Sequence, residues 1–130
     1  MERAGRRTYG RPMAKTLSTS SDLVRDAEHD EESNTLRATV EGEINLHNSP
    51  ALRSDLLSLA EQTKPDVVEL DLAGVPYMDS SAIAVLVELL KAVRKHKGNV
   101  RLRELQPRVK GLLQIARLDS IFDLSDGNSE

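Results

Sequence analysis

Apolar and polar residues alternate with a period of two along residues 35–44 and 67–72. Such alternation predicts β-strands that have one buried and one solvated face. Shorter apolar runs predict a strand at residues 23–27, which pairs with residues 35–44 as a hairpin, a strand at residues 100–105, and a final short strand or turn at residues 120–124. The side chains predicted to face the core from the two alternating strands are Leu36, Ala38, Val40, Ile44, Val68, Leu70 and Leu72.

Three segments with helical spacing separate these strands. The first begins at Ser49, which can accept hydrogen bonds from free amides, and Pro50 suits the first helical position. The second covers residues 80–97 and is predicted to end at Gly98 in the left-handed conformation. The third covers residues 107–118. The apolar faces predicted for the three helices are, in order, Leu52, Leu56, Leu59 and Ala60; Ile83, Leu86, Val87 and Leu90; and Val109, Leu112, Leu113 and Ala116.

The element order is therefore β-β-α-β-α-β-α. Short strands joined through helices are expected to run parallel with right-handed crossovers. Parallel strands covered on both faces are usually solid apolar runs, whereas these strands carry charged residues on alternate positions. We therefore predict an α/β domain with a small, mostly parallel or mixed sheet of four to five strands and helices packed on one face.

Length and charge define the domain boundaries. The chain has 130 residues, 38% of them hydrophobic, which suits one domain. Residues 1–17 carry a charge of about +4, so the remaining residues must carry about −7 to give the formal net charge of −3. We predict a disordered basic tail over residues 1–20, a single domain over residues 21–125 and a disordered C-terminus over residues 126–130.

Composition also narrows the function classes. The chain has no cysteine, so disulfides and thiolate metal sites are excluded. No apolar run approaches the roughly 20 residues of a membrane span, and the N-terminus lacks the apolar core of a signal peptide. We expect a cytoplasmic protein. The basic tail and an aromatic content of 2% make a weak footprint for nucleic-acid or membrane-surface binding, so we interpret the tail as solvated.

The motif Asp79-Ser80-Ser81 stands directly before the apolar helix. The simplest interpretation is that Ser80 or Asp79 caps the free amides of that helix. A second interpretation is a partner site, because the first turns of the helix are apolar nearly all round and some of that surface must face another element. Phosphorylation of a hydroxyl there would add about −1.5 to −2 charges to an apolar contact and disrupt it. The helix residues predicted to face a partner are Ala82, Ala84 and Val85.

An enzyme is the less favoured hypothesis. Ser80 could form a nucleophilic triad with His29, His47 or His96, but no Gly-x-Ser-x-Gly elbow is present. His96 lies roughly 24 Å from Ser80 along the same helix, and His47 is interpreted as a surface loop residue. No carboxylate spacing suggests a metal site and no glycine-rich loop suggests a phosphate cradle. We expect no catalysis, no metal and no cofactor.

Three stretches of the chain form a further pattern: VEGEINLHNSPALRSDLL, VVELDLAGVPYMDSSAIAVLVELLKAVRKHKGNVRL and VKGLLQIARLDSIFDL. Together they resemble the STAS domain of bacterial anti-sigma factor antagonists, and the resemblance covers residues 22–124. The strand VVELDL followed by MDSS and an apolar helix is its most specific part. In family members regulated by phosphorylation, the serine directly after the aspartate is modified by an anti-sigma kinase, and that position is Ser80 here.

The resemblance implies partner switching. The unmodified chain would bind an anti-sigma serine kinase and free a sigma factor, phosphorylation of Ser80 would release the kinase, and a phosphatase would restore the chain. Ser81 is the second choice for the modified residue. Neither direct nucleic-acid binding nor membrane insertion is implied, and a weak homodimer is left open. The motif and the resemblance together suggest these partner contacts: Asp79, Ser81, Ala82, Ala84, Val85 and Asn45.

Two positions depart from the family pattern. Ala82 and Ile83 stand where a glycine often follows the serines, and Asn45 replaces a frequent aspartate. The alternative function within the same family is a non-enzymatic docking subunit of a lipid-transport ABC system or of a stress-signalling complex. In that case the hydroxyl of Ser80 would be structural. Neighbouring genes for a kinase and phosphatase, or for a permease and ATPase, would separate these two hypotheses.

Overall fold

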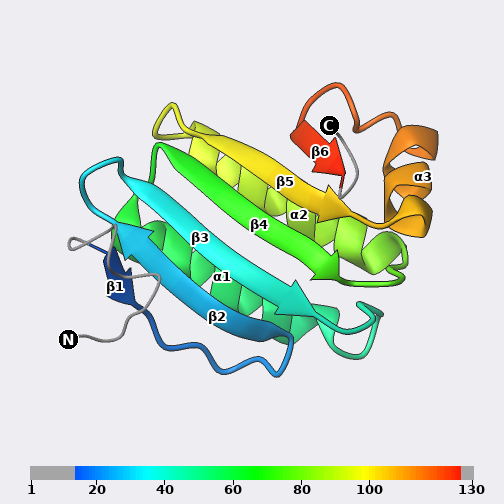
Figure 1. Cartoon of the computed structure of the whole chain (residues 1–130), viewed down its shortest axis with the longest axis horizontal. Coiled ribbons are helices and arrows are strands. Elements are labelled where there is room, and N and C mark those ends of the chain that lie inside the picture. The colour runs from blue at the N-terminus through cyan, green and yellow to red at the C-terminus, as the bar shows by residue number, and fades with distance from the viewer. Residues whose placement is uncertain (1–13, 127–130) are drawn as a thin grey trace.

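The computed structural model describes residues 14–126, which form one mixed β-sheet with two long helices packed against it (Figure 1). The α/β class and the one-sided packing of the helices are those predicted. The strands are β1 (Ala14–Thr16), β2 (Val24–Asp30), β3 (Thr35–Glu41), β4 (Val67–Gly74), β5 (Asn99–Leu105) and β6 (Asp123–Asp126). The helices are α1 (Ser49–Thr63), α2 (Ser80–Arg94) and α3 (Pro107–Ile115).

The strands lie side by side in the order β1-β2-β3-β4-β5-β6. The pairs β1/β2 and β2/β3 are antiparallel, while β3/β4, β4/β5 and β5/β6 are parallel because a helix or a long connection returns the chain to the same end. The predicted hairpin and parallel strands are confirmed. The sheet has six strands rather than four to five, since β1 lies in the segment predicted to be disordered.

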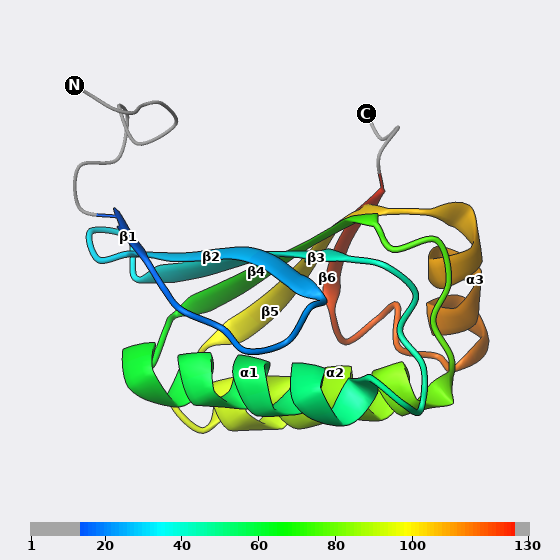
Figure 2. The same cartoon turned by 90° about the horizontal axis from the view of Figure 1, so that it is seen from below.

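Helices α1 and α2 cover one face of the sheet, and α3 lies at the end where β4 and β5 finish (Figure 2). Apolar residues of the strands point to the helices, and all seven strand residues predicted for the core are buried. The apolar face predicted for α1 is buried as well. Because β-strand side chains alternate between faces, the charged residues between these positions lie on the open face.

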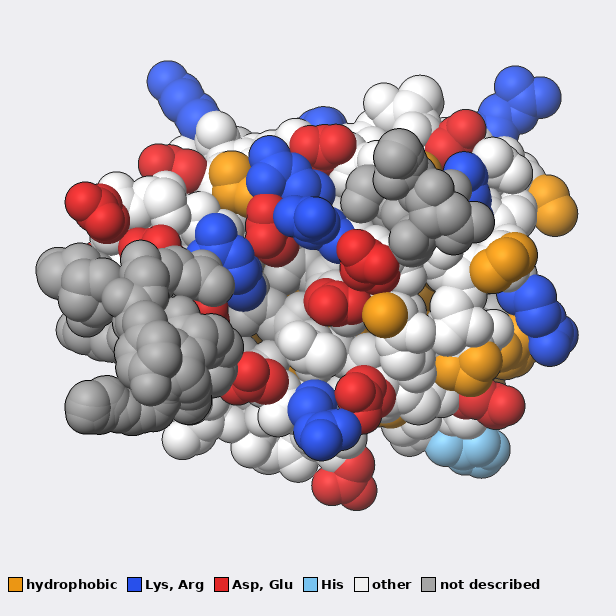
Figure 3. All heavy atoms as spheres, viewed as in Figure 1, with side chains coloured by type: hydrophobic (Ala, Val, Ile, Leu, Met, Phe, Trp, Pro, Cys, Tyr) orange, Lys and Arg blue, Asp and Glu red, His pale blue; other side chains and the backbone are white. Residues whose placement is uncertain are grey.

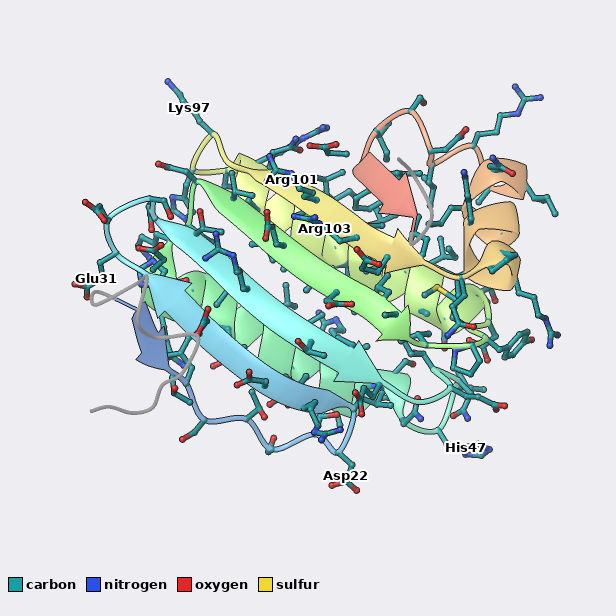
Figure 4. All side chains as sticks on the ribbon, viewed as in Figure 1. Asp22, Glu31, His47, Lys97, Arg101 and Arg103 are labelled. Atoms are coloured by element: carbon teal, nitrogen blue, oxygen red, sulfur yellow. The ribbon has the colours of Figure 1, made fainter. Side chains whose placement is uncertain are left out.

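A row of alternating charges crosses the open face. Arg37, Glu69, Arg101 and Asp123 are register partners on β3, β4, β5 and β6. The guanidinium of Arg37 lies 3.1 Å from Glu69, Arg101 lies 2.6 Å from Glu69, and Arg101 lies 3.0 Å from Asp123. Arg103 adds a contact of 3.6 Å to Glu69 (Figure 4). Opposite charges on adjacent strands favour this pairing over a shifted register.

Glu69 is the carboxylate at the centre of this row. Its burial opposes ionisation, but the hydrogen bond from Arg101 and the positive charges of Arg37, Arg101 and Arg103 outweigh burial and lower its pKa. A lowered pKa means that the folded chain keeps Glu69 charged at pH values where the unfolded chain has begun to bind a proton. The contribution of Glu69 to stability is complete above its ordinary pKa of 4.5 and is lost as the pH falls through the lowered value.

Replacing Glu69 with glutamine is therefore expected to flatten the loss of stability in acid. Urea midpoints measured between about pH 6 and pH 2 should fall less steeply for Glu69→Gln than for the native chain. The variant starts from a lower midpoint at neutral pH, because the arginines lose their shared partner. Glu61→Gln removes an exposed carboxylate on α1 and should keep the native slope. Equal slopes for Glu69→Gln and the native chain would contradict this account.

The boundary predicted for the N-terminal tail is wrong for residues 14–20. β1 pairs with β2, and the amide of Leu17 donates to the carbonyl of Ala27 at 2.8 Å. The buried carboxylate of Asp55 on α1 accepts hydrogen bonds from the amides of Ser20 and Ser21, at 3.1 and 2.6 Å. The polar sequence of this segment gave no sign of these contacts, because the segment is held by backbone pairing and by one buried aspartate and not by apolar side chains. Residues 1–13 and 127–130 lie outside the described residues.

Two helix ends differ from the prediction. Ser49 is the first residue of α1 and Asn48 occupies the cap position, with its side-chain oxygen bound to the amide of Asn45 instead of capping. Helix α2 ends at Arg94, and Lys97, not Gly98, takes the left-handed conformation with φ of 66°. Gly98 is needed for a different reason: a Cβ there would lie 2.6 Å from the carbonyl oxygen of Pro65.

Candidate functional site

Two loops meet at the end of the sheet where the parallel strands finish. One joins β3 to α1 and the other joins β4 to α2. Ile44 and Met78 form an isolated parallel bridge, in which the amide of Ile44 donates to Tyr77 at 3.1 Å and the amide of Asp79 donates to Ile44 at 3.0 Å. The bridge continues the β3/β4 pairing into the loops. It brings the Asp79-Ser80-Ser81 motif beside the start of α1, at the edge where sites gather in open sheets of this kind.

Asp79 is the N-cap of α2, as one of the two capping interpretations predicts. Its Oδ1 accepts a hydrogen bond from the amide of Ser81 at 2.8 Å and another from the hydroxyl of Ser81. Its Oδ2 accepts from the amide of Leu46 at 3.1 Å, which ties the other loop to the helix. These bonds, first of all that from the Ser81 hydroxyl, lower the pKa of Asp79. The carboxylate therefore stays ionised at neutral pH and keeps these hydrogen bonds.

Ser80 is the first residue of α2 and is exposed. Its hydroxyl has no hydrogen-bonding partner among residues 14–126. Ser81 is half-buried and its hydroxyl is occupied by Asp79. Of the two serines, Ser80 is thus the one whose hydroxyl is open to a reagent, while the cap is provided by its neighbour.

A shallow depression of about 390 Å³ separates the start of α2 from α3. Its walls include Tyr77, Ser80, Arg108 and Ile115. The guanidinium carbon of Arg108 lies 5.0 Å from the centre of the Tyr77 ring, a cation–π contact. Ser80 therefore sits on the rim of a surface that is apolar apart from Asp79 and this arginine.

Of the three exposed large apolar residues in the described chain, two line this depression and the third lies on the neighbouring loop. Ile115 is 82% exposed, Leu46 is 71% exposed and Tyr77 is 38% exposed. Tyr77 and Ile115 line the depression, and Leu46 is held to Asp79 through its amide. We call Leu46, Tyr77, Ser80 and Ile115 the loop-end surface. Hydrophobic side chains gather at the end of the molecule near α3, whereas charged side chains dominate the open sheet face (Figure 3). Exposed apolar side chains that lie close together are typical of interaction surfaces.

The prediction of which side of α2 is buried in the core is wrong. Ala82 and Val85 are buried, at 1% and 4% exposure, and cannot contact a partner. Ala84 is exposed, as predicted for a contact residue, while Ile83 and Val87, predicted for the core, are only half-buried. The true core stripe of α2 is Ala82, Val85, Leu86, Leu89, Leu90 and Val93. Similarly, Ala116, predicted for the core after α3, is exposed.

The side chain of Asn45 forms hydrogen bonds within its own loop. Its side-chain oxygen accepts hydrogen bonds from the amides of His47 and Asn48, at 2.9 and 3.2 Å, and so closes the turn that enters α1. Its side chain is half-buried beside the motif loop. His47 is exposed on this loop and points away from the sheet (Figure 4), as predicted for a surface histidine.

The sequence interpretation missed Leu46, Tyr77, Arg108 and Ile115. A signal for the first two was present, because each is a large apolar residue in a polar loop and belongs to no periodic element. No signal marks Arg108, since an arginine in the first turn of a helix is common on solvated surfaces. Its contact with Tyr77 depends on the packing of α3 against the end of the sheet.

Removing the carboxylate of Asp79 should loosen both loops at once. In Asp79→Ala the amides of Leu46 and Ser81 lose their acceptor, so their hydrogen exchange should accelerate about two- to tenfold, and the denaturant midpoint should fall. Amide exchange followed by NMR measures this directly. Asp71→Ala is the matched control, because Asp71 lies on β4, the strand that leads to Asp79, and its carboxylate accepts a hydrogen bond from the backbone amide of Ala73. Unchanged exchange at Leu46 in Asp79→Ala would show that the loops are held by other contacts.

Within residues 14–126 no group of three or more His, Asp or Glu side chains is arranged to hold a metal ion. No helix in that part of the chain is long and apolar enough to cross a membrane.

Comparison with known proteins defines the family. The STAS domain family model matches residues 26–129, so the chain belongs to the STAS domain family, as the motifs predicted. The anti-sigma-B factor antagonist of Bacillus subtilis (strain 168) is 36% identical over 92 residues, which cover 71% of this chain and 83% of that protein.

Solved structures have the same fold. An anti-sigma-factor antagonist (STAS) domain protein from Planctomyces limnophilus superposes with a TM-score of 0.69 at 20% identity, covering 81% of this chain and 90% of that one. The Bacillus cell fate determinant SpoIIAA in its phosphorylated form superposes with a TM-score of 0.58 at 13% identity, covering 88% and 92% of the two chains.

Proposed function

We propose that this chain is an anti-sigma factor antagonist that acts by partner switching, in the cytoplasm where sigma factors work. In its unmodified form it binds an anti-sigma factor that is also a serine kinase, and so frees a sigma factor for transcription. The observation that carries the proposal is the exposed hydroxyl of Ser80, which has no partner among the described residues and stands within an exposed apolar surface. The similarity to curated antagonists supports the same class of function.

The loop-end surface is the proposed contact for the kinase. Leu46, Tyr77 and Ile115 offer apolar area around Ser80, and docking there would bring the hydroxyl to the kinase. Burial of such anchors commonly supplies most of the affinity of an interface. Ala84 and the half-buried Ile83 and Val87 of α2 replace Ala82 and Val85 as the proposed helix contacts.

Phosphorylation is the proposed release step. The Ser80 oxygen forms a bond to the γ-phosphorus of the nucleoside triphosphate bound by the kinase, and the bond from that phosphorus to the bridging oxygen of the departing diphosphate breaks. The hydroxyl proton passes to a base of the kinase. The product carries about −1.5 to −2 charges in the middle of an apolar contact, which disfavours the complex. A phosphatase that delivers water to the phosphorus would return the hydroxyl.

The test is the intact mass of the full chain purified from its own host under several growth conditions, with peptide mapping of residues 75–95. A phosphate on Ser80 in at least one condition is the expected result. One unmodified mass in every condition would overturn the switch and favour the docking-subunit hypothesis, in which Ser80 serves only as the start of α2.

A further inference from the structure

Arg108 is a cation without a carboxylate partner among the described residues. Its guanidinium is placed over the Tyr77 ring at 5.0 Å and is exposed to solvent. Most arginines of the folded part are instead paired with acidic side chains, namely Arg25, Arg37, Arg53, Arg101 and Arg103. An arginine in contact with a ring is positioned while its hydrogen-bond donors stay available.

Arg108 and Ser80 line the same depression. A phosphate on Ser80 would also lie beside the carboxylate of Asp79, another wall of that depression, whose charge repels it. Arg108 is the only basic residue among those walls. A guanidinium binds a phosphate through two parallel charged hydrogen bonds, a stronger contact than an exposed cation–π contact.

We propose that Arg108 is the phosphate-binding residue of the modified chain: on phosphorylation of Ser80 its guanidinium leaves the Tyr77 ring and binds the phosphate. This proposal rests on the proposed function, of which it describes the regulated state. The exchange changes the loop-end surface in two ways, since a charged pair bridges the depression and the ring of Tyr77 loses its cation. Partner release would then depend on a rearranged surface as well as on added charge.

The test uses the full chain with phosphoserine placed at position 80 by genetic code expansion, so that no kinase is needed. The second pKa of the phosphate, ordinarily about 6, is measured by phosphorus NMR during a pH titration. A bound guanidinium stabilises the dianion, so this pKa should rise by about half a unit or more in Arg108→Gln. Arg108→Lys should retain part of the effect. Arg117→Gln, which removes an exposed arginine just past α3 that does not line the depression, should leave the pKa unchanged.

A second measurement follows the guanidinium itself. The side-chain protons of Arg108 should show a ring-current shift from Tyr77 in the unmodified chain, and the shift should disappear with phosphoserine at position 80. An identical phosphate pKa in the native and Arg108→Gln backgrounds, or an unchanged ring-current shift, would overturn the proposal. Because the phosphate is installed without a kinase, this outcome is separate from the host mass measurement, which alone decides whether Ser80 is modified in the cell.

Discussion

Replacing Val85 with glutamate is expected to lower the free energy of unfolding by about 3 kcal/mol or more. Val85 is 4% exposed on the side of α2 that belongs to the core. A carboxylate there would stand among the buried apolar residues of the core and must either remain ionised in that environment or take up a proton. The free energy of unfolding of a domain of this size is only about 5–15 kcal/mol. The variant should therefore unfold at a much lower urea concentration than the native chain.

Ala84→Glu is the matched control for this prediction. It places the same side chain one residue earlier, on the exposed side of α2, and should change stability by less than about 0.5 kcal/mol. Urea unfolding followed by circular dichroism compares the two. A stable, folded Val85→Glu chain would mean that α2 is rotated relative to the structure and that Val85 faces solvent. The pair therefore decides which face of the helix is free for a partner.

Replacing Ser80 with alanine is expected to abolish phosphorylation completely and to leave the fold intact. The hydroxyl makes no hydrogen bond to any described residue, and the cap of α2 is Asp79, so unfolding should change by less than about 0.5 kcal/mol. Alanine also has the highest helix propensity, which suits the first turn of α2. Intact mass of the variant from its own host, together with urea unfolding, measures both effects.

Ser81→Ala is the control that separates the two serines. Ser81 donates its hydroxyl to Asp79, so its removal should disturb the cap but leave phosphorylation at position 80 in place. A phosphate retained in Ser80→Ala and lost in Ser81→Ala would move the modified site to Ser81. Loss of the phosphate in both variants would instead indicate that the kinase needs the capped loop geometry.

The sequence was informative about the sheet for a clear reason. Strand side chains alternate with a fixed period of two, so an apolar residue at every second position of residues 35–40 and 67–72 specifies the buried face without reference to the rest of the fold. The start of α2 could be predicted as well, because an aspartate followed by two serines and a long apolar run is typical of a capped helix N-terminus.

The facing of α2 could not be predicted in this way. Residues 82–87 are all apolar, so a helical period of 3.6 selects no face among them. The buried face of α2 is determined by its contacts with α1 and with the sheet. These contacts bury Ala82 and Val85 and leave Ala84 exposed. Gly98 shows the same limit: its role is a close approach to the carbonyl of Pro65, 33 residues away, not the local cap that its position suggested.

Local periodicity and capping in the sequence were enough to predict every element except β1, the order of those elements, the open sheet face and the motif at the start of α2. The tertiary structure decided which serine is open, which face of α2 is free and which apolar residues surround Ser80. Those properties depend on contacts between residues far apart along the chain, such as Asp79 with Leu46 and Arg108 with Tyr77. Local patterns carry no information about such contacts, because they form only when the strands place their loops side by side.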